Sequence, residues 1–372
     1  MRILQITDNI SKNSGVSSVI MNLYRGMDRE RIQFDFLVMN CVENSYEKEI
    51  REMGGEVYYV ASPLVLANLL VSRKEINNFF KKYSSKYKTI HLHTPTLAFF
   101  TLRIAKKYNI KNRIVHSHST MFSLSKLKSI IHFILLINLK RDANIYWACS
   151  DKAAEFLYGK KYLRDQKVQI INNAINCNPY KFNLDIRKEY RDRFGLNGKF
   201  VIGNVARFNN IKNHKFMIEV IEKISEIDKN IMLLLIGDGE EKEKILELIK
   251  LKGLEKQVVC LGFRKDIYNI LQCVDTFILP SLKEGLPVVA VEAQASGLPC
   301  YLSKNITKEV NLGGVQYLDL DVDIWVDKLK NKVFNEKREE VFAEFKKSKF
   351  NIENEALRVQ NIYIKLNESN ME

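Results

Sequence analysis

Two glutamates give the first sign of chemistry in this sequence. They lie in the stretch Ser281-Leu-Lys-Glu-Gly-Leu-Pro-Val-Val-Ala-Val-Glu292, which follows the apolar run 274–279. Pro287 suits the first turn of a helix, because an N–H group there would have no partner within the helix. The pattern predicts a strand, a loop that carries Glu284 and a helix that carries Glu292. The alternative is a surface turn and helix with two solvated glutamates.

A second candidate site follows the apolar run 200–205, where Arg207 and Lys212 lie in one loop. Two cations at this spacing can hold one pyrophosphate, with about 1.5–3 kcal/mol for each charge-assisted hydrogen bond. The alternative is a pair of ordinary surface cations. The N–H groups of a helix start also favour anions. Together with the glutamates, this chemistry suits a ligand that carries both phosphates and hydroxyls, such as a sugar nucleotide.

Three further loops and four histidines follow predicted strands. The loops are Asn13-Ser-Gly15, Ile236-Gly237-Asp-Gly and Leu261-Gly-Phe263-Arg264, in which glycine lets the backbone approach a ligand or simply makes the turn. The histidines form two pairs, His91 with His93 and His116 with His118, each at a predicted strand end. A single histidine at such a place is usually structural, whereas four make a functional role an even alternative.

The stretch 280–299, together with the Arg207-x4-Lys212 spacing, resembles the donor site of retaining glycosyltransferase family 4. The resemblance is closest to the branch that builds capsular and exopolysaccharides, extends from residue 1 to about 325 and is densest over 200–303. It implies an α/β protein of the GT-B fold, in which two Rossmann-like domains with parallel sheets face each other across a cleft.

The resemblance also implies roles for single residues. Arg207 and Lys212 would bind the diphosphate. Glu292 would hold the ribose hydroxyls, and Glu284 would hold the hydroxyls of the transferred sugar. The N–H groups of Gly285 and Leu286 would lie near that sugar. Gly237 would border the donor cleft, and the backbone at Phe263 and Arg264 would meet the base. Gly15 would approach phosphate, although many relatives have two adjacent glycines there. His118 would lie near the reacting sugar, with His116 as the competing choice and His93 as an acceptor contact. The expected catalytic residues are Glu284, His118, Arg207 and Lys212.

The order of apolar runs predicts two domains. Strand-length runs at 3–6, 34–38, 57–60, 89–92, 113–115, 145–148 and 169–171 alternate with helix-length segments, and the rhythm restarts at 200–205 after the charged stretch 183–198. Further runs follow at 232–236, 258–261, 276–279 and 300–302. This alternation is typical of parallel sheets covered by helices. We expect domains at 1–182 and 183–350, and a C-terminal helix in 351–372 that crosses back onto the first domain.

Composition limits the partners. The chain has 372 residues and a formal net charge of +14, which favours an anionic partner. The acidic residues Asp319, Asp321 and Asp323 lie at a predicted helix start, where they suit capping. We therefore expect no metal and no cofactor, with the cations of the second loop in place of a metal. We see no nucleic-acid-binding motif.

Cysteines and hydropathy bear on location. The six cysteines form no C-x-x-C pair, which favours free thiols in a reducing compartment. No segment approaches the roughly 20 apolar residues of a membrane span. Residues 101–145 hold nine Lys or Arg and one acidic residue, Asp142, around the apolar run 129–139. This segment is either a core helix with solvated ends or a surface that docks on the anionic inner face of the cell membrane.

These observations predict a cytoplasmic, peripherally membrane-associated, metal-independent retaining glycosyltransferase. It would move a hexosyl or N-acetylhexosaminyl group from a nucleotide sugar, expected to be UDP-linked, to a lipid-linked saccharide during surface polysaccharide assembly. Two alternatives remain: a nucleotide-sugar epimerase or phosphorylase on a similar fold, and a non-catalytic basic protein that binds membrane or nucleic acid.

Overall fold

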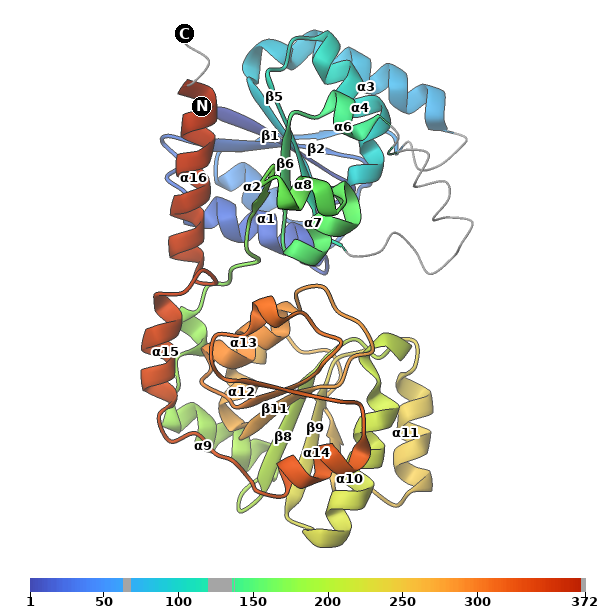
Figure 1. The fold of residues 1–372 in the computed structure, drawn as a ribbon, viewed down its shortest axis with the longest axis vertical. Coiled ribbons are helices and arrows are strands. Elements are labelled where there is room, and N and C mark those ends of the chain that lie inside the picture. Colours follow the sequence, from blue (N-terminus) through green and yellow to red (C-terminus); the bar gives the residue numbers. More distant parts are fainter. Residues whose placement is uncertain (63–67, 120–135, 137, 369–372) are drawn as a thin grey trace. The chain divides into compact units, whose positions relative to one another are not determined.

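The computed structural model describes residues 1–62, 68–119, 136 and 138–368. It divides into two compact units (Figure 1): unit 1 comprises Met1–Ala174 with Ile352–Glu372, and unit 2 comprises Ile175–Asn351. Each unit contains one sheet whose strand pairs are all parallel, and helices connect the strands. The predicted α/β class with parallel sheets is confirmed.

The sheet of unit 1 has the order β3-β2-β1-β4-β5-β6-β7. Alternate residues of its central strand enter different cores, since Ile3 packs in one apolar cluster and Leu4 and Ile6 pack in another. A sheet buried on both faces explains why its strands read as continuous apolar runs. The strands are β1 Arg2–Thr7, β2 Gln33–Val38, β3 Val57–Tyr59, β4 Thr89–Leu92, β5 Asn112–Ser117, β6 Ile145–Ala148 and β7 Val168–Ile170.

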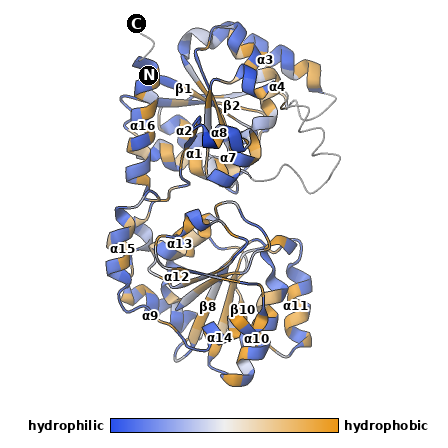
Figure 2. Ribbon diagram, in the orientation of Figure 1, coloured by the Kyte–Doolittle hydropathy of each residue, from blue (hydrophilic) through white to orange (hydrophobic). Residues whose placement is uncertain are grey.

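Eight described α-helices belong to unit 1. They are α1 Gly15–Gly26, α2 Glu47–Glu52, α3 Leu69–Tyr83, α4 Ala98–Lys107, α6 Leu139–Asp142, α7 Asp151–Tyr158, α8 Lys160–Arg164 and α16 Ile352–Glu368. Figure 2 shows apolar colour concentrated on the strands and polar colour on the outward faces of the helices. Among the described residues, no helix is both long enough and apolar enough to cross a membrane.

Helix α16 brings the end of the chain into unit 1. Its residues Ala356, Val359 and Tyr363 are at most 1% exposed and pack in the same cluster as β2 and α1. A Cβ atom at Gly26 would lie 2.8 Å from the Cβ of Ala356, so glycine permits the close approach of α1 to α16. The buried carboxylate of Glu355 accepts the N–H of Asn172 at 2.6 Å. The C-terminal helix is therefore an integral part of unit 1.

Unit 2 has the sheet order β10-β9-β8-β11-β12-β13. Its strands are β8 Phe200–Val205, β9 Ile231–Ile236, β10 Val258–Cys260, β11 Thr276–Leu279, β12 Cys300–Ser303 and β13 Val315–Leu318. Its α-helices are α9 Leu184–Arg193, α10 His214–Ile227, α11 Lys242–Leu251, α12 Ile267–Cys273, α13 Val288–Ala295, α14 Val322–Leu329 and α15 Arg338–Lys346.

All twelve predicted strands are present within two residues, but β13 was not predicted. It is a four-residue edge strand after Gly313 and Gly314, too short and too polar to stand out from a turn. The structure also divides the chain at 174/175, whereas the sequence suggested 182/183. The reason is that Ile175, Cys177 and Tyr180 are buried in the core of unit 2.

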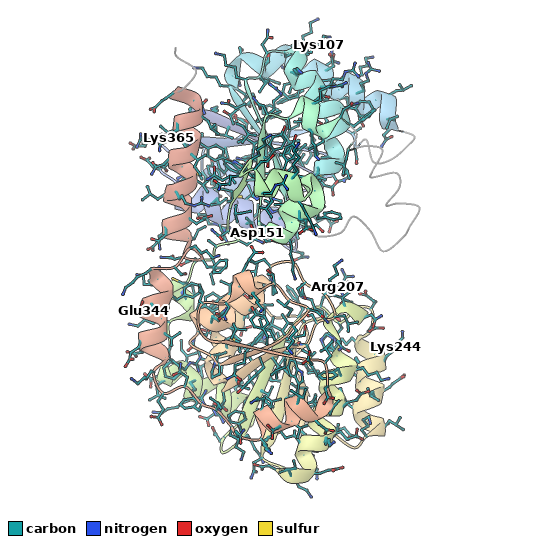
Figure 3. The ribbon with its side chains drawn as sticks, in the orientation of Figure 1. Lys107, Asp151, Arg207, Lys244, Glu344 and Lys365 are labelled. Carbon is teal, nitrogen blue, oxygen red and sulfur yellow. The ribbon has the colours of Figure 1, made fainter. Side chains whose placement is uncertain are left out.

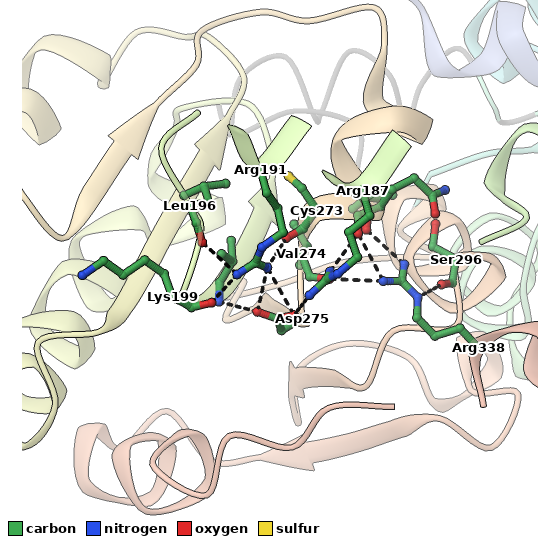
Figure 4. Close-up of polar contacts among 12 residues, drawn as sticks. Arg187, Arg191, Leu196, Lys199, Cys273, Val274, Asp275, Ser296 and Arg338 are labelled. Atoms are coloured by element: carbon green, nitrogen blue, oxygen red, sulfur yellow. Dashed lines mark hydrogen bonds and ion pairs between the residues drawn. The ribbon is translucent and has the colours of Figure 1, made fainter. Parts of the chain in front are cut away.

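A buried ionic network joins α9 to the sheet of unit 2 (Figure 4). The carboxylate of Asp275, which is 4% exposed, pairs with the guanidinium groups of Arg187 and Arg191 and accepts the N–H of Val201 at 2.7 Å. The Arg191 contact measures 3.2 Å from Nη1 to Oδ2. The network therefore connects α9, β8 and the start of β11.

Arg338 extends this network without a carboxylate of its own. Its guanidinium is 1% exposed and donates to the carbonyl oxygens of Ser296 at 2.7 Å and Leu271 at 3.1 Å. Its charge also lies 4.4 Å from the ring centroid of Phe182. Burial lowers the pKa of Arg338 to about 9. Figure 4 shows Asp275 between Arg187 and Arg191, whereas Arg338 lies on the far side of Arg187 and donates to carbonyl oxygens.

We expect Asp275→Asn to destabilise unit 2 by about 3–5 kcal/mol, because it leaves buried guanidinium charges without their counter-ion. Urea unfolding followed by a probe in unit 2 measures this change. Asp319→Asn is the matched control, since Asp319 pairs with Lys304 at 2.5 Å but is 59% exposed. The control should cost at most about 1 kcal/mol. Equal costs for the two variants would contradict a structural role of the buried network.

Candidate functional site

The candidate donor site of unit 2 lies where the strand order reverses. Strand β8 pairs with β9 on one side and with β11 on the other, although β9 and β10 separate β8 from β11 in the sequence. At such a point the connections after the two neighbouring strands leave on opposite faces, which creates a binding site at the carboxyl ends. The loop with Arg207 and Lys212 follows β8, and the loop with Glu284 follows β11.

The structure brings Lys212 and Glu284 into direct contact. The ammonium of Lys212 forms an ion pair with the Glu284 carboxylate, and the same Oε1 accepts from the Ser281 hydroxyl at 2.9 Å. The side chains are only 18% and 15% exposed. The N–H of Leu282 donates to the carbonyl of Ile211 at 2.8 Å, which joins the two loops. Two residues expected on different parts of a ligand therefore contact each other directly.

Local capping explains how Lys212 is held. Asn209 caps the short helix Asn210–Lys212, and its Oδ1 accepts the N–H of Lys212 at 3.1 Å. Asn213 then adopts a left-handed conformation with φ of 58°, which asparagine tolerates better than most residues. This tight turn leads directly into α10 and fixes the direction in which the lysine leaves the loop.

Arg207 is not part of the Lys212–Glu284 contact. Its side chain is 69% exposed and pairs with Glu240, with 3.1 Å between Nη2 and Oε2. Figure 3 labels Arg207 at the surface of unit 2. An exposed ion pair of this kind contributes at most about 1 kcal/mol, so a phosphate can replace Glu240 at low cost. Sequence reasoning missed Glu240, which follows a different strand.

Gly237 packs against the backbone of the loop that follows β8. Its φ is 144°, and a Cβ atom there would lie 1.9 Å from the carbonyl oxygen of Ala206. One residue further on, the N–H of Phe208 donates to the carbonyl of Asp238 at 3.0 Å. The loop after β9 therefore packs backbone against backbone on the loop that carries Arg207, and only glycine fits at position 237.

Glu292 lies on α13, half-buried, next to Tyr180. Burial raises the pKa of the Glu292 carboxyl, and a hydrogen bond from Tyr180 partly opposes that rise. Pro287 is the N-cap of α13, one position before the first helical turn in which it was expected. Leu286 is 9% exposed and packs in the core of unit 2, and Gly285 is half-buried. Sequence reasoning missed Tyr180, which is about 110 positions away.

In the loop after β10, the side chain of Arg264 is engaged in hydrogen bonds, whereas the side chain of Phe263 is exposed. Arg264 pairs with Asp266 through two hydrogen bonds of 2.8 and 2.6 Å, and Tyr190 donates to the same carboxylate at 2.8 Å. Phe263 is 62% exposed. The guanidinium of Arg264 thus braces its own loop, which leaves the Phe263 ring and the backbone as the groups that can meet a ligand.

In unit 1, Gly15 begins α1 and Ser14 caps it, with the Ser14 hydroxyl accepting the N–H of Ser17 at 3.4 Å. A Cβ atom at Gly15 would have no heavy atom within 4 Å. Packing within unit 1 therefore does not require glycine here, and the space above this helix start is open. The loop follows β1, which neighbours β4 at the point where this sheet reverses its order.

The four candidate histidines form one cluster on β4 and β5. His91 and His116 lie inside the strands and are 0% exposed, and His93 is 3% exposed. His118 follows β5 and is half-buried. Of the two residues considered for the contact with the reacting sugar, His118 reaches the surface of unit 1, whereas His116 is enclosed beneath it.

The ring nitrogens of the cluster are largely paired with one another. His91 Nε2 lies 3.2 Å from His116 Nδ1, and His93 Nδ1 lies 2.9 Å from His118 Nε2. One ring nitrogen from each of His91, His93 and His116 lies within 4.8 Å of the other two, a spacing that a metal could also use. Existing hydrogen bonds occupy most of those lone pairs. Sequence reasoning grouped the histidines in two pairs, each along one strand, and missed the contacts that join one pair to the other.

The acidic residues near Asp321 act as expected. Asp321 caps α14 by accepting the N–H groups of Asp323 at 2.9 Å and Ile324 at 3.1 Å. Asp319 and Asp323 form ion pairs with Lys304 and Lys223. The prediction that these residues have capping or surface roles is confirmed.

The model of "Glycosyltransferase Family 4" matches residues 13–178, and the model of "Glycosyl transferases group 1" matches residues 186–309. The chain is 32% identical over 336 residues to the putative glycosyltransferase EpsF of Bacillus subtilis. The aligned region covers 88% of this chain and 86% of EpsF. The chain is 27% identical to a UDP-Gal:alpha-D-GlcNAc-diphosphoundecaprenol alpha-1,3-galactosyltransferase of Escherichia coli, over 78% of this chain and 76% of that one.

Among solved structures, HepE of Anabaena in complex with UDP superimposes with a TM-score of 0.78 at 18% identity, over 98% of this chain and 100% of HepE. The two parallel sheets and the similar solved structure confirm the predicted GT-B fold, and the family models and relatives identify a glycosyltransferase. Within that class, the chain belongs to glycosyltransferase family 4.

The buried histidines should make the folded protein less stable as the pH falls. Burial lowers the pKa values of His91, His93 and His116 well below the usual value for histidine. Burial also lowers the pKa of His118 to about 3 and the pKa of His214, in unit 2, to about 4. Since the unfolded chain binds protons below about pH 6.5 and the folded chain does not, stability falls as pH drops through this window. Each group should cost about 1.4 kcal/mol between about pH 7.5 and 5.5.

Hydrogen exchange measured separately for β4 and β5 and for β8 and β9 tests this prediction. We expect unit 1, with four such histidines, to lose about 5 kcal/mol, and unit 2, with His214, to lose about 1.4 kcal/mol. Equal losses in the two units would contradict it.

Proposed function

We propose that this glycosyltransferase moves a hexosyl or N-acetylhexosaminyl group from a UDP-linked sugar to a lipid-linked saccharide, with retention of configuration, during capsule or exopolysaccharide assembly. The observation that carries the proposal is the enclosed Lys212–Glu284–Ser281 contact at the sheet reversal of unit 2. The UDP complex of HepE and the diphosphoundecaprenol acceptor named for the Escherichia coli relative support the donor and acceptor classes.

Donor binding is then an exchange of partners. The diphosphate competes with Glu284 for the Lys212 ammonium, which frees the carboxylate to accept hydrogen bonds from sugar hydroxyls. Arg207 leaves Glu240 for the phosphate, at a cost below about 1 kcal/mol. In this proposal Glu292 accepts hydrogen bonds from the ribose hydroxyls, and its half-buried position beside Tyr180 supports that role.

Transfer requires that the bond from C1 of the sugar to the phosphate oxygen break while a bond to the acceptor oxygen forms on the same face. The departing phosphate oxygen takes the proton of the acceptor hydroxyl. Lys212 and Arg207 stabilise the negative charge that develops on the diphosphate, which is greatest in the transition state. This role of the two cations makes the reaction independent of a metal ion, in our proposal.

Replacing the donor-site residues should reduce transfer selectively. We expect Lys212→Ala, Arg207→Ala and Glu284→Ala each to lower kcat/KM about 10- to 100-fold, the loss of about 1.5–3 kcal/mol in charge-assisted hydrogen bonding. Glu284→Ala should affect kcat more than UDP affinity. UDP release from UDP-hexoses, with polyprenyl-diphosphate sugars as acceptors, measures the effect.

Lys215→Ala is the matched control, because Lys215 is 73% exposed on α10 and pairs only with Glu219 among the described residues. A rise in melting temperature with UDP that EDTA does not reduce would support a metal-independent donor site. Near-normal transfer by all three site variants would contradict the assignment.

We also propose that unit 1 docks on an anionic membrane surface. A hollow of about 980 Å³ lies between α3, α4 and α6, and its one acidic lining residue, Asp142, is paired with Arg141 at 3.2 Å. Leu70 at its rim is 78% exposed. Six cations line it: Arg73, Lys74, Arg103, Lys106, Lys107 and Arg141. Apolar side chains among cations suit lipid headgroups.

This surface overlaps the predicted segment 101–145 only in part. Lys126, Lys128 and most of the apolar run 129–139 lie outside the described residues. Sequence reasoning missed Arg73 and Lys74, because α3 lies about 30 positions before α4. Lys107 is labelled at the outer end of α4 in Figure 3.

We expect the triple variant Arg73→Gln/Lys106→Gln/Lys107→Gln to bind vesicles rich in phosphatidylglycerol about 100-fold less tightly, from roughly 1 kcal/mol per cation. Sedimentation with these vesicles measures the partition. The control Lys215→Gln/Lys244→Gln/Lys250→Gln removes the same charge from exposed positions of unit 2. An equal loss in both variants, or none in the first, would contradict docking through this surface.

A further inference from the structure

A continuous hydrogen-bond chain runs through the histidine cluster by way of two residues outside it. His93 Nε2 lies 2.7 Å from Gln5 Oε1 on β1, and Gln5 Nε2 lies 3.5 Å from the hydroxyl of Tyr363 on α16. That hydroxyl lies 2.6 Å from His91 Nδ1. With the two contacts between histidines, the chain runs from His118 to His116 through β1 and the C-terminal helix.

One end of the chain fixes the proton positions. Gln5 Oε1 can only accept, so His93 must carry its proton on Nε2, which leaves Nδ1 with a lone pair. The contact between His93 Nδ1 and His118 Nε2 is then made by a proton on His118 Nε2. The neutral ring of His118 consequently has an unprotonated Nδ1.

The other branch follows the same logic. Gln5 Nε2 donates to the Tyr363 oxygen, so the Tyr363 proton points to His91 Nδ1, and His91 Nε2–H donates to His116 Nδ1. The reverse order would direct two donors at the Tyr363 oxygen and leave its own proton without an acceptor. The remaining nitrogen, His116 Nε2, is buried and has no partner among the described residues.

We propose that Gln5 and Tyr363 are positioning residues that hold the cluster in a single pattern of protons, so that His118 offers a lone pair on Nδ1. Nδ1 has no hydrogen-bond partner among the described residues, and the side chain is half-buried. His118 therefore accepts a hydrogen bond from a ligand hydroxyl. That the ligand is the sugar rests on the proposed function, whereas the pattern of protons does not.

Gln5 is the residue on which His118 depends, and Tyr363 stabilises the other branch. Gln5 lies at 0% exposure between the two branches, and Tyr363 is 1% exposed against Trp147, with ring centroids 5.3 Å apart. Replacing Gln5 removes the acceptor that fixes His93. Replacing Tyr363 removes the donor to His91 and leaves the His93–Gln5 contact in place. The two variants thus form a matched pair with different expected targets.

The test is the ¹⁵N spectrum of the ring nitrogens in full-length protein labelled at histidine, because protonated and unprotonated ring nitrogens have well-separated shifts. In the wild type we expect His93 and His118 to carry the proton on Nε2. Gln5→Met should give mixed tautomers at these two residues. Tyr363→Phe should give them at His91 and His116 and leave His118 unchanged.

Transfer assays provide the second measurement. Gln5→Met should lower kcat about 10-fold with unchanged affinity for UDP, and Tyr363→Phe should lower it less than about 3-fold. A wild-type proton on His118 Nδ1, an unchanged His118 tautomer in folded Gln5→Met, or ring shifts that respond to EDTA would overturn the proposal. If Gln5→Met does not fold, the wild-type and Tyr363→Phe spectra still decide it. If UDP does not bind, the proposed function is refuted. The nitrogen spectra still test the pattern of protons, because that pattern does not depend on the ligand.

Discussion

The reversal of strand order in each parallel sheet is the constraint on which the candidate sites depend. A parallel strand must be followed by a crossover, and where the order reverses two neighbouring crossovers leave on opposite faces. The loops that follow β8 and β11, and those that follow β1 and β4, then lie next to one another at the carboxyl edge of their sheet. Lys212 meets Glu284 for this reason, although 71 residues separate them in the chain.

Three charged side chains of the candidate donor site are each paired with another side chain of unit 2. Lys212 holds Glu284, Arg207 holds Glu240 and Tyr180 holds Glu292. Buried groups without partners would be costly, so these contacts keep the site stable. The exposed Arg207 pair is weak and easily exchanged, whereas a ligand that separates the enclosed Lys212–Glu284 pair must satisfy both charges.

Helix α16 links stability to the chemistry of unit 1. Its apolar face packs with α1 and β2, its Glu355 receives the N–H of Asn172, and its Tyr363 enters the histidine cluster. The same helix thus completes the core and supplies one donor of the hydrogen-bond chain. A buried network of this kind is stable only when nearly every member has a partner. Among the described residues, every ring nitrogen of the four histidines has one except His116 Nε2, which is buried, and His118 Nδ1 on the half-buried ring.

The sequence by itself determined the class of fold and twelve of the strands, because strands buried on both faces read as apolar runs. It also predicted a donor site, because the Arg-x4-Lys and Glu-x7-Glu spacings are local. It could not give β13, whose four residues resemble a turn, or the boundary at 174/175, which depends on where Tyr180 is buried. Only the tertiary structure decided which side chains become partners. Glu240, Tyr180, Gln5 and Tyr363 come from elements distant in the sequence, and their contacts arise from sheet order and helix packing, which no local pattern records.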